Sequence, residues 1–402
     1  MKAVVEDHVF MESMPQFDTR TDIYKGGRVE DSYVHEVTFV IRQRNLEELT
    51  RLLHDVSNPS SQHYGQHLTR QEVLDLTSNP TSRDAVVKFL NSNGANVVSE
   101  TLGGEYVTAS ATIGVWERLF KSEFSTFRST ESNGHMRESV RTEKYWMPYE
   151  LHSHVESVFN MIDVPDKLSR GLVLSRNDQT EKLRQRPSIG NVKYNGVMTP
   201  HTLRGYYNMS THIGCSLSSQ AVHVATGNHY SLADLEAFQA VHGILAPSGL
   251  TLPTDTGPTV CHTPECAGGN LDLQYITSLS PGSPTTLLKS AESWESWLVE
   301  VANIAVPPLV ISLTYGSTEA AVTTGVHSAF TTQAIKLGVM GVTLFAASGD
   351  DGVHSAAVRK EGVAKCGYAP EFPAGNPYVT AVGATSVIKV TCLAWLYLPP
   401  YI

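Results

Sequence analysis

A sequence of 402 residues is longer than one hydrophobic core usually accommodates, and it predicts two domains. Hydrophobic residues make up 41% and charged residues 17%, which is typical of a globular protein rather than a disordered one. The formal net charge of −10 at pH 7 gives no electrostatic support for nucleic-acid binding. No apolar stretch is long enough to predict a membrane span.

The first part of the chain alternates short strands and helices. Residues 35–42 show the period of a half-buried strand, and a helix over 46–56 is ended by Asn58-Pro59. Thr69 and Glu72 form a capping box that opens a helix through Leu76. The remaining predicted elements are helices over 81–90 and after Thr112, and strands over 96–99, 105–109, 123–128 and 140–146. This order predicts a compact α+β unit that ends near Val164.

Residues 166–194 differ in character from the segments on either side. They are rich in Arg, Lys, Gln, Asn and Ser and show no clear period, which predicts an exposed linker. The basic sites within it would offer many cuts to a protease, while a plain surface connection is the alternative interpretation.

Beyond Thr199-Pro200 strands and helices alternate regularly. Residues 221–225 predict a strand, and Ser231 with Asp234 opens a helix over 232–243. Further helices are predicted over 271–279, around 294–304 and over 320–337, with strands over 309–313, 342–347 and 378–382. The alternation predicts a parallel sheet covered by helices.

The segment GVTLFAASGDDG, residues 341–352, is the most informative stretch of the chain. An apolar run from Val342 to Ala347 stops at a Ser-Gly-Asp-Asp-Gly turn, as a buried parallel strand does where it reaches a cleft. Ligands of open α/β sheets gather at such strand ends. Asp350 is therefore either a working group or a turn-former, because Asp and Gly are common turn residues.

Several segments resemble one known family. NPSSQHYGQHLT lies within residues 55–72, and TPHTLRGYY covers 199–207. The others are NLDLQY at 270–275, SLTYG at 312–316, ASGDDG at 347–352 and FPAGNPYVTAVG at 372–383. Through them the chain resembles the sedolisins, the serine-carboxyl peptidases, over roughly residues 35–387.

The resemblance implies an α/β fold: a subtilisin-like parallel-sheet catalytic domain, here incomplete, behind a ferredoxin-like α+β activation prodomain. The expected domains are the prodomain at 30–165, a linker at 166–195, the partial catalytic domain at 196–388 and an unrelated apolar tail at 389–402. The resemblance also implies an acid-acting peptidase made as a zymogen. Its partners would be a peptide or protein substrate and its own prodomain, with no nucleic acid and no membrane.

A secreted or lysosomal or vacuolar location is implied for the full gene product, although no signal peptide is visible at the N-terminus. The resemblance also implies calcium in the complete enzyme, at a loop that lies beyond this chain. No metal or cofactor ligands are expected within these 402 residues.

The family uses a Ser–Glu–Asp triad in place of Ser–His–Asp, which suits acid because histidine would be protonated there. Carried over by motif, Asp272 takes the place of the aspartate that supports the glutamate base. Asp350 takes the place of the oxyanion aspartate, which must be protonated to donate a hydrogen bond. Asp351 has no assigned role. We expect Asp272 and Asp350 to converge at one crevice.

Two departures from the family bear on activity. The glutamate base lies four residues before the aspartate in the family, but here that position is Gly268. Glu265 lies seven residues back, on the same face if the helix extends so far, although Gly268-Gly269 favours a helix start or a loop. The family's Gly-Thr-Ser nucleophile motif lies beyond the last match. The chain as printed is therefore expected to be inactive, and a non-catalytic pseudopeptidase that binds peptides or another peptidase is the alternative.

Overall fold

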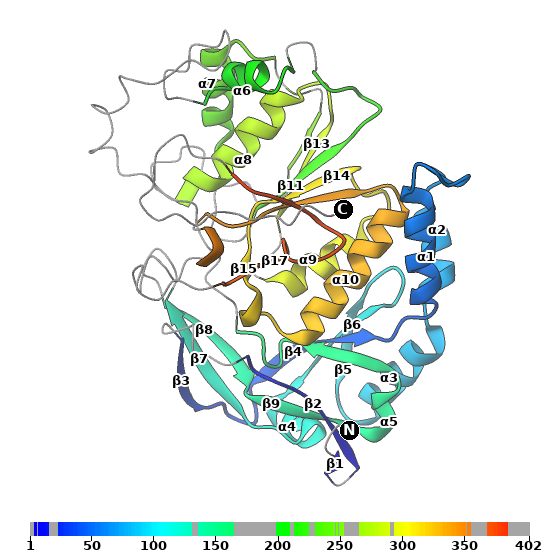
Figure 1. Ribbon diagram of the computed structural model, residues 1–402. Helices are drawn as coiled ribbons and strands as arrows, with labels where there is room; N and C mark the ends of the chain where they lie inside the picture. The colour runs from blue at the N-terminus through cyan, green and yellow to red at the C-terminus, as the bar shows by residue number, and fades with distance from the viewer. Residues whose placement is uncertain are drawn as a thin grey trace. The chain divides into compact units, whose positions relative to one another are not determined.

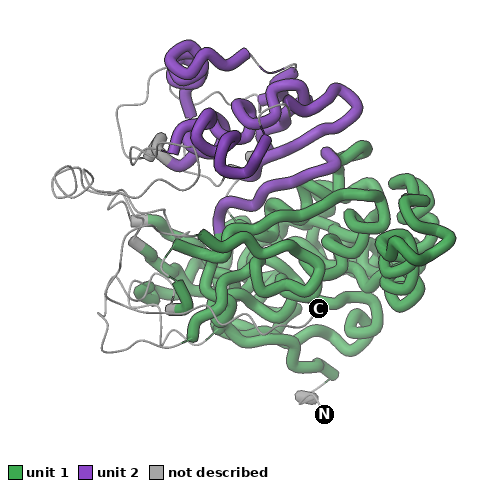
Figure 2. The backbone as a smooth tube through the Cα atoms, turned by 45° about the horizontal axis from the view of Figure 1, so that its top comes forward, with its two compact units in different colours: residues 1–169, 291–307, 316–402 green, residues 170–290, 308–315 purple. Residues whose placement is uncertain are grey.

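The computed structural model describes residues 4–5, 7–15, 23–130, 136–164, 198–209, 213–224, 230–245, 247, 249–252, 265–289, 293–350, 352–354 and 368–384. The chain forms two compact units, coloured separately in Figure 2. The first comprises residues 1–169, 291–307 and 316–402, and the second comprises residues 170–290 and 308–315. The whole predicted linker and the whole predicted apolar tail lie outside the described residues, and the predicted domain boundaries stay predictions.

An antiparallel four-stranded sheet forms the centre of the first unit. Its order is β10-β4-β6-β5, from Val155–Phe159, Val34–Ile41, Tyr106–Thr112 and Asn96–Glu100. Phe39 and Val107 are register partners in the two central strands, and both are fully buried. Val37, Phe39 and Ile41 on one face of β4 belong to the main apolar core. Strand β6 alternates buried and half-buried positions after Tyr106, whereas β4 is buried at every position from Val37 to Ile41.

The first unit also contains two antiparallel sheets of three strands each. One has the order β1-β2-β9, from Val4–Val5, His8–Ser13 and Lys144–Pro148. The other has the order β3-β7-β8, from Ile23–Arg28, Phe124–Thr130 and Met136–Thr142. Strands β1, β2 and β3 were not predicted from the sequence, and neither was β10.

Together with five helices, these three sheets make up the described part of residues 4–164, called the α+β region below (Figure 1). The helices are α1 Leu46–Ser57, α2 Arg70–Thr77, α3 Pro80–Ser92, α4 Ile113–Phe120 and α5 Tyr149–His152. The capping box at Thr69 and Glu72 is confirmed, with the side chain of each residue bonded to the backbone N–H of the other. Thr112 is the N-cap of α4 but makes no side-chain cap hydrogen bond.

The first unit also contains a helical pair from the second half of the chain: α9 Trp294–Asn303 and α10 Thr324–Val339. The prediction that the second of these helices starts at residue 320 was wrong. Glu319–Ala321 form a separate 3-10 turn, and Thr323 then caps α10 by accepting a hydrogen bond from the Val326 N–H.

Short strands accompany that helical pair in the first unit. β16, Thr343–Ala347, pairs in parallel with β18, Thr380–Val382. β15, Ser317–Thr318, pairs antiparallel with β17, Glu371–Phe372, and a 3-10 turn covers Gly352–His354. The aromatic rings of Trp294, Trp297, Phe330 and Phe372 pack together between these elements, with centroid separations of 5.0–6.0 Å.

The second unit is a small parallel sheet with helices. Its strand pairs give the order β12-β13-β11-β14, from Leu250–Thr251, Thr285–Lys289, Gln220–Val224 and Val310–Leu313, and all three pairings are parallel. The helices are α6 Pro200–Tyr206, α7 Leu232–His242 and α8 Glu265–Leu279. Figure 1 shows all three gathered to one side of the strands.

Helix α8 begins earlier than the sequence predicted. It starts at Glu265 and runs through Gly268-Gly269, where a helix start or loop was expected. Glycine pairs weaken an isolated helix by about 1 kcal/mol per residue relative to alanine. Tertiary contacts outweigh that penalty here: Gly269 is buried, and the Asn270 side chain accepts from the Ser231 N–H and donates to the Asp234 carboxylate.

The predicted fold class, an α+β region followed by an α/β domain with a parallel sheet, is confirmed. Within the described ranges no helix is both long and apolar enough to cross a bilayer.

Candidate active site and activation-domain contact

Two side chains and one backbone carbonyl, from three separate elements, meet at the carboxyl ends of parallel strands in the second unit. Asp272 lies on α8, His223 in β11, and Thr314 directly after β14. The Thr314 Oγ1 lies 2.8 Å from Asp272 Oδ2 and 3.1 Å from the His223 carbonyl oxygen. The structure therefore places the predicted catalytic Asp272 at the carboxyl end of a parallel sheet, where ligands of such sheets bind.

Local packing explains how Asp272 reaches this position. Its neighbour Leu273 is 1% exposed and belongs to an apolar cluster with Val222 and Leu287 of the sheet, so α8 lies against the strands. His223 is the register partner of Leu313, and Thr314 is the next residue of the chain. Asp272 remains half-buried beside the apolar contact.

His223 contributes its backbone carbonyl to this group, and its side chain is buried. The imidazole meets the Tyr315 ring edge-on, with 6.3 Å between centroids. Burial lowers the pKa of His223 to about 4. The ring is therefore neutral above that pH, because burial disfavours the charged form.

Asp350 lies in the first unit, in the bend that follows β16, and is exposed. The turn requires Gly349, whose φ of +91° lies in the region that favours glycine, and a Cβ there would meet Glu371 Cγ at 2.9 Å. The structure thus places Asp350 at the end of a parallel strand, as predicted. Asp272 and Asp350 belong to different units, so their convergence stays a prediction, and Asp351 lies outside the described residues.

Glu265 is the first residue of α8. A separation of seven residues is close to two helical turns, which places Glu265 and Asp272 on nearly the same face of the helix. The condition that the helix extends that far is met. Its role as a base stays a prediction.

A second set of contacts lies within the first unit, where the α+β region meets α9 and α10. Carboxylates of the α+β region bind along α10 from its first turn to its last turn. Glu12 of β2 accepts from the Gly325 N–H at 2.6 Å, and Glu156 of β10 accepts from the Ser328 hydroxyl. The first contact satisfies a backbone donor at a helix N-terminus, where a negative charge is also favoured by the helix dipole.

Near the other end of α10, Lys336 donates to Glu105 across 3.3 Å, and each side chain is only 1% exposed. Glu105 also accepts from the Thr101 hydroxyl at 3.0 Å. Burial lowers the pKa of Lys336 in spite of the carboxylate beside it. A buried pair of this kind depends on both partners, since either charge alone would be buried without compensation.

Asp163 adds another carboxyl beside the start of α10. It bonds to the side chain of Thr323, the N-cap residue. Burial raises its pKa well above the ordinary value, and the neighbouring charges of Glu295 and Glu12 add to that rise, while Arg141 and the Thr323 hydrogen bond oppose it. The ionised form of Asp163 is therefore disfavoured here.

Arg70 at the start of α2 binds the C-terminus of α9. Its guanidinium donates to the Val301 carbonyl at 3.0 Å and to the Ile304 carbonyl at 2.8 Å. Carbonyls at a helix C-terminus lack partners within the helix, and a cation there is favoured by the dipole. The Leu102 N–H donates to the Asn303 side chain at 3.1 Å next to this contact.

The segment NPSSQHYGQHLT contributes to the same contact. The Leu68 N–H donates to the Val339 carbonyl at 2.9 Å. His67 lies so close to Gly341 that a Cβ on the glycine would meet its ring at 2.7 Å, and Gly341 has a φ of +85°. Beneath the segment an apolar cluster joins helices α1, α2 and α10 through Leu49, Val73, Ile335 and Val339.

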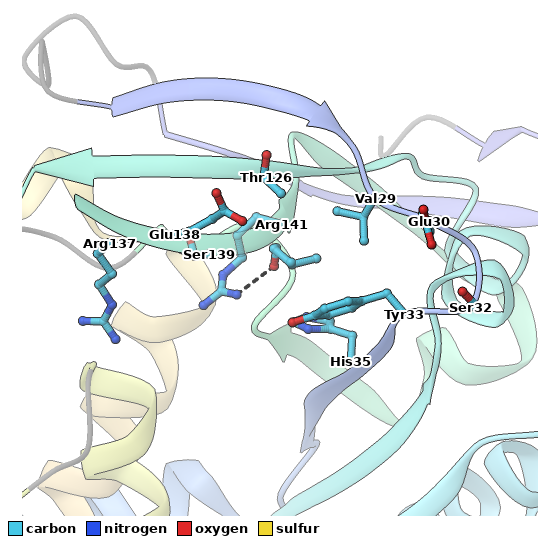
Figure 3. Close-up of a pocket in the computed structure, with 11 residues that line it drawn as sticks. Val29, Glu30, Ser32, Tyr33, His35, Thr126, Arg137, Glu138, Ser139 and Arg141 are labelled. Atoms are coloured by element: carbon cyan, nitrogen blue, oxygen red, sulfur yellow. Dashed lines mark hydrogen bonds between the residues drawn. The ribbon is translucent and has the colours of Figure 1, made fainter.

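The α+β region also carries a pocket of about 580 Å³ beside the connection between β3 and β4 (Figure 3). Arg141 and His35 line it, but the arginine serves the protein itself, donating to the Asp163 and Val140 carbonyls and to the Asn160 side chain. Burial lowers the pKa of His35 to about 4, with Arg141 adding to the effect. Glu30 and Glu138 balance the charges of Arg137 and Arg141 in the lining, so the pocket favours no charged ligand.

Among the described residues no group of three or more His, Cys, Asp or Glu side chains could hold a metal ion. The calcium implied by the sequence resemblance is therefore not assigned to any residue here.

Both the α+β region and the chain as a whole are similar to known proteins. Residues 21–164 match the family model of the pro-kumamolisin activation domain. The chain is 28% identical over 377 residues to tripeptidyl-peptidase 1 of Canis lupus familiaris, covering 90% of this chain and 63% of that protein. It is 28% identical over 393 residues to tripeptidyl-peptidase 1 of Homo sapiens, covering 92% of this chain and 66% of that protein. The chain thus spans 63% to 66% of the length of these curated relatives.

Among solved structures, Pseudomonas sedolisin, a serine-carboxyl proteinase complexed with pseudo-iodotyrostatin, matches with a TM-score of 0.38 and 20% identity. That match covers 48% of this chain and 55% of the other.

Proposed function

Because this chain belongs to the sedolisin family, we propose that it is the precursor of an acid-acting serine-carboxyl peptidase. The observation that supports this most directly is the position of Asp272. It is a half-buried carboxyl at the carboxyl end of a parallel sheet, and it lies in the motif that carries the family's supporting aspartate.

In the proposed reaction a serine attacks the peptide carbonyl and a glutamate removes the serine proton. Asp272 supports that glutamate, since two neighbouring carboxyls can share a proton and remain a useful base in acid. Asp350, protonated, donates a hydrogen bond to the oxyanion that develops on the carbonyl oxygen. The serine and the glutamate are not assigned to residues of this chain.

The α+β region is proposed to act as the activation domain of a zymogen. Its support is the contact with α9 and α10, which combines an apolar cluster, a buried ion pair and bonds to both helix termini. We propose that cleavage of the segment after Val164 releases it. The substrate class is peptides or proteins, cut internally or as N-terminal tripeptides, in a lysosomal, vacuolar or secreted compartment.

The test begins with the transcript, sequenced through its stop codon. If it encodes a downstream Gly-Thr-Ser segment, the protein expressed with that segment is expected to hydrolyse a fluorogenic tripeptide or an internally quenched peptide in acid. Asp272→Asn and Asp350→Asn are expected to lower kcat by at least about 100-fold, as loss of an oxyanion donor or of a base's support does. Exposed Asp75→Asn is the control. Hydrolysis that survives both substitutions would contradict the proposal.

A second candidate function follows from Gly268, which stands where the family has its base and has no side chain to serve as one. A pseudopeptidase would bind peptides without cutting them. A transcript that ends after Ile402, together with peptide binding by calorimetry and no hydrolysis in acid, would favour this alternative.

A further inference from the structure

Thr314 brings one hydroxyl to two acceptors. Its Oγ1 lies 2.8 Å from the Asp272 carboxylate and 3.1 Å from the His223 carbonyl. A threonine hydroxyl has one proton to donate and can also accept. It therefore cannot donate fully to both acceptors at the same time.

The protonation state of Asp272 decides which bond the hydroxyl makes. While Asp272 is ionised, the proton goes to its carboxylate, because a charge-assisted hydrogen bond is the stronger one and this contact is the shorter. When Asp272 is protonated, its own O–H donates to Thr314, and the threonine proton turns to the His223 carbonyl. Rotation of the Thr314 hydroxyl thus preserves the hydrogen bond between Thr314 and Asp272 in both protonation states of Asp272.

The elements packed against α8 supply other ionisable groups. Helix α7 contributes Asp234, which accepts from the Asn270 side chain, and also carries Glu236 and His242. Helix α6 contributes Arg204, which donates to the Ser278 and Leu279 carbonyls at the far end of α8, and His201. Strand β11 contributes His223, which is neutral above about pH 4.

We infer that Thr314 is a positioning residue for Asp272: its hydroxyl fixes the orientation of the carboxyl group and favours the ionised form. The inference rests on the proposed function, in which Asp272 supports the catalytic base. Thr314 lies one residue past the end of β14, the strand that pairs with β11. From there its hydroxyl connects helix α8 to the sheet, at the place where the proposed reaction would occur.

The test measures the titration of Asp272 itself in the full chain, without substrate. The protein is labelled with ¹³C at aspartate carboxyl groups, and the Asp272 resonance is identified as the one missing from Asp272→Asn. Thr314→Val keeps the shape of the side chain and removes the hydroxyl. It is expected to raise the pKa of Asp272 by about one pH unit, since a hydrogen bond to a charged group contributes roughly that much.

Thr314→Ser keeps the hydroxyl and is expected to titrate as the unsubstituted protein does. Thr277→Val is the matched control. It removes a buried hydroxyl on α8, the helix that carries Asp272, and that hydroxyl bonds within the helix to the Leu273 and Gln274 carbonyls. If Thr314→Val does not fold, Thr314→Ala provides the hydroxyl-free variant. An Asp272 pKa that is unchanged or lower without the hydroxyl would overturn the inference. Because no turnover is measured, that outcome is separate from failure of the proposed peptidase activity.

Discussion

Lys336 and Glu105 form an ion pair in the interior of the first unit, with 3.3 Å between nitrogen and oxygen and 1% exposure on each side. The lysine belongs to α10 and the glutamate directly precedes β6, 231 residues apart in the chain. A lysine in the middle of a buried helix face requires such a partner. The pair therefore makes the docking of the α+β region on α10 specific.

Removing one member of this pair is expected to destabilise the protein strongly. Lys336→Met leaves Glu105 buried and uncompensated, which costs about 3–5 kcal/mol, while the double change Lys336→Met with Glu105→Met recovers most of the loss. Urea unfolding at neutral pH measures both. The exposed pair Arg128–Glu138 is the control, where Arg128→Met is expected to cost less than about 1 kcal/mol. Equal effects at the two pairs would contradict the prediction.

Asp163 is expected to make stability depend on pH. Its folded-state pKa lies well above the ordinary value of 3.8, so at neutral pH ionisation is favoured more in the unfolded chain than in the folded one, and this destabilises the folded state. That penalty disappears as the pH falls through the folded-state pKa towards 3.8. Asp163→Asn is therefore expected to raise the melting temperature at neutral pH and to give no gain below about pH 3.8. Exposed Asp75→Asn is the control. An equal gain in melting temperature at both pH values for Asp163→Asn would refute the account.

His35 is expected to make the folded protein less stable as the pH falls, which is the opposite of the effect of Asp163. Its pKa is lowered from 6.5 to about 4, so the folded state favours the neutral ring. The unfolded chain binds the proton first as the pH falls below 6.5, and stability is lost until the folded-state pKa near 4 is reached. His35→Gln is expected to flatten the fall in melting temperature between these pH values. His201→Gln is the exposed control, and a slope that persists in His35→Gln would count against the prediction.

Arg70 is expected to hold the end of α9. Arg70→Met removes two donors to helix-terminal carbonyls and is expected to cost about 2–3 kcal/mol, because those carbonyls then lose their partners. Arg118→Met provides a control, since Arg118 is exposed and donates once, to the Asn93 carbonyl at a helix C-terminus. Urea unfolding compares the two. Hydrogen exchange in the last turn of α9 should rise only in the Arg70 variant.

Periodicity and capping signals predicted best the elements whose stability depends on residues close together in the sequence. The capping box at Thr69 formed, and Ser231 caps α7 through the Asp234 N–H as expected. The helix through Gly268-Gly269 was missed because its stability comes from contacts with α7 and the sheet rather than from propensity. Strand β13 was missed for a related reason, since a short apolar run does not distinguish a buried strand from other structure.

The candidate site was only partly predictable. Family motifs identified Asp272 and Asp350, and the structure places each at the end of a parallel strand or beside one. The role of Thr314 was not predicted, although it lies in the quoted SLTYG motif, because no spacing rule connects position 314 with position 272. Lys336 and Glu105 likewise carry no local signal, as buried pairs distant in sequence are recognised only after folding.

Glu12 shows how early the folded part of the chain starts. Its carboxylate caps α10 from strand β2, well before the predicted start of the prodomain at residue 30 and before the family match at residue 21. A shortened protein beginning at either point would leave the first turn of α10 without this acceptor and β9 without the strand that pairs with it. Recombinant versions of the α+β region should therefore keep residues 8–13, because without them its contact with α10 is expected to be weaker.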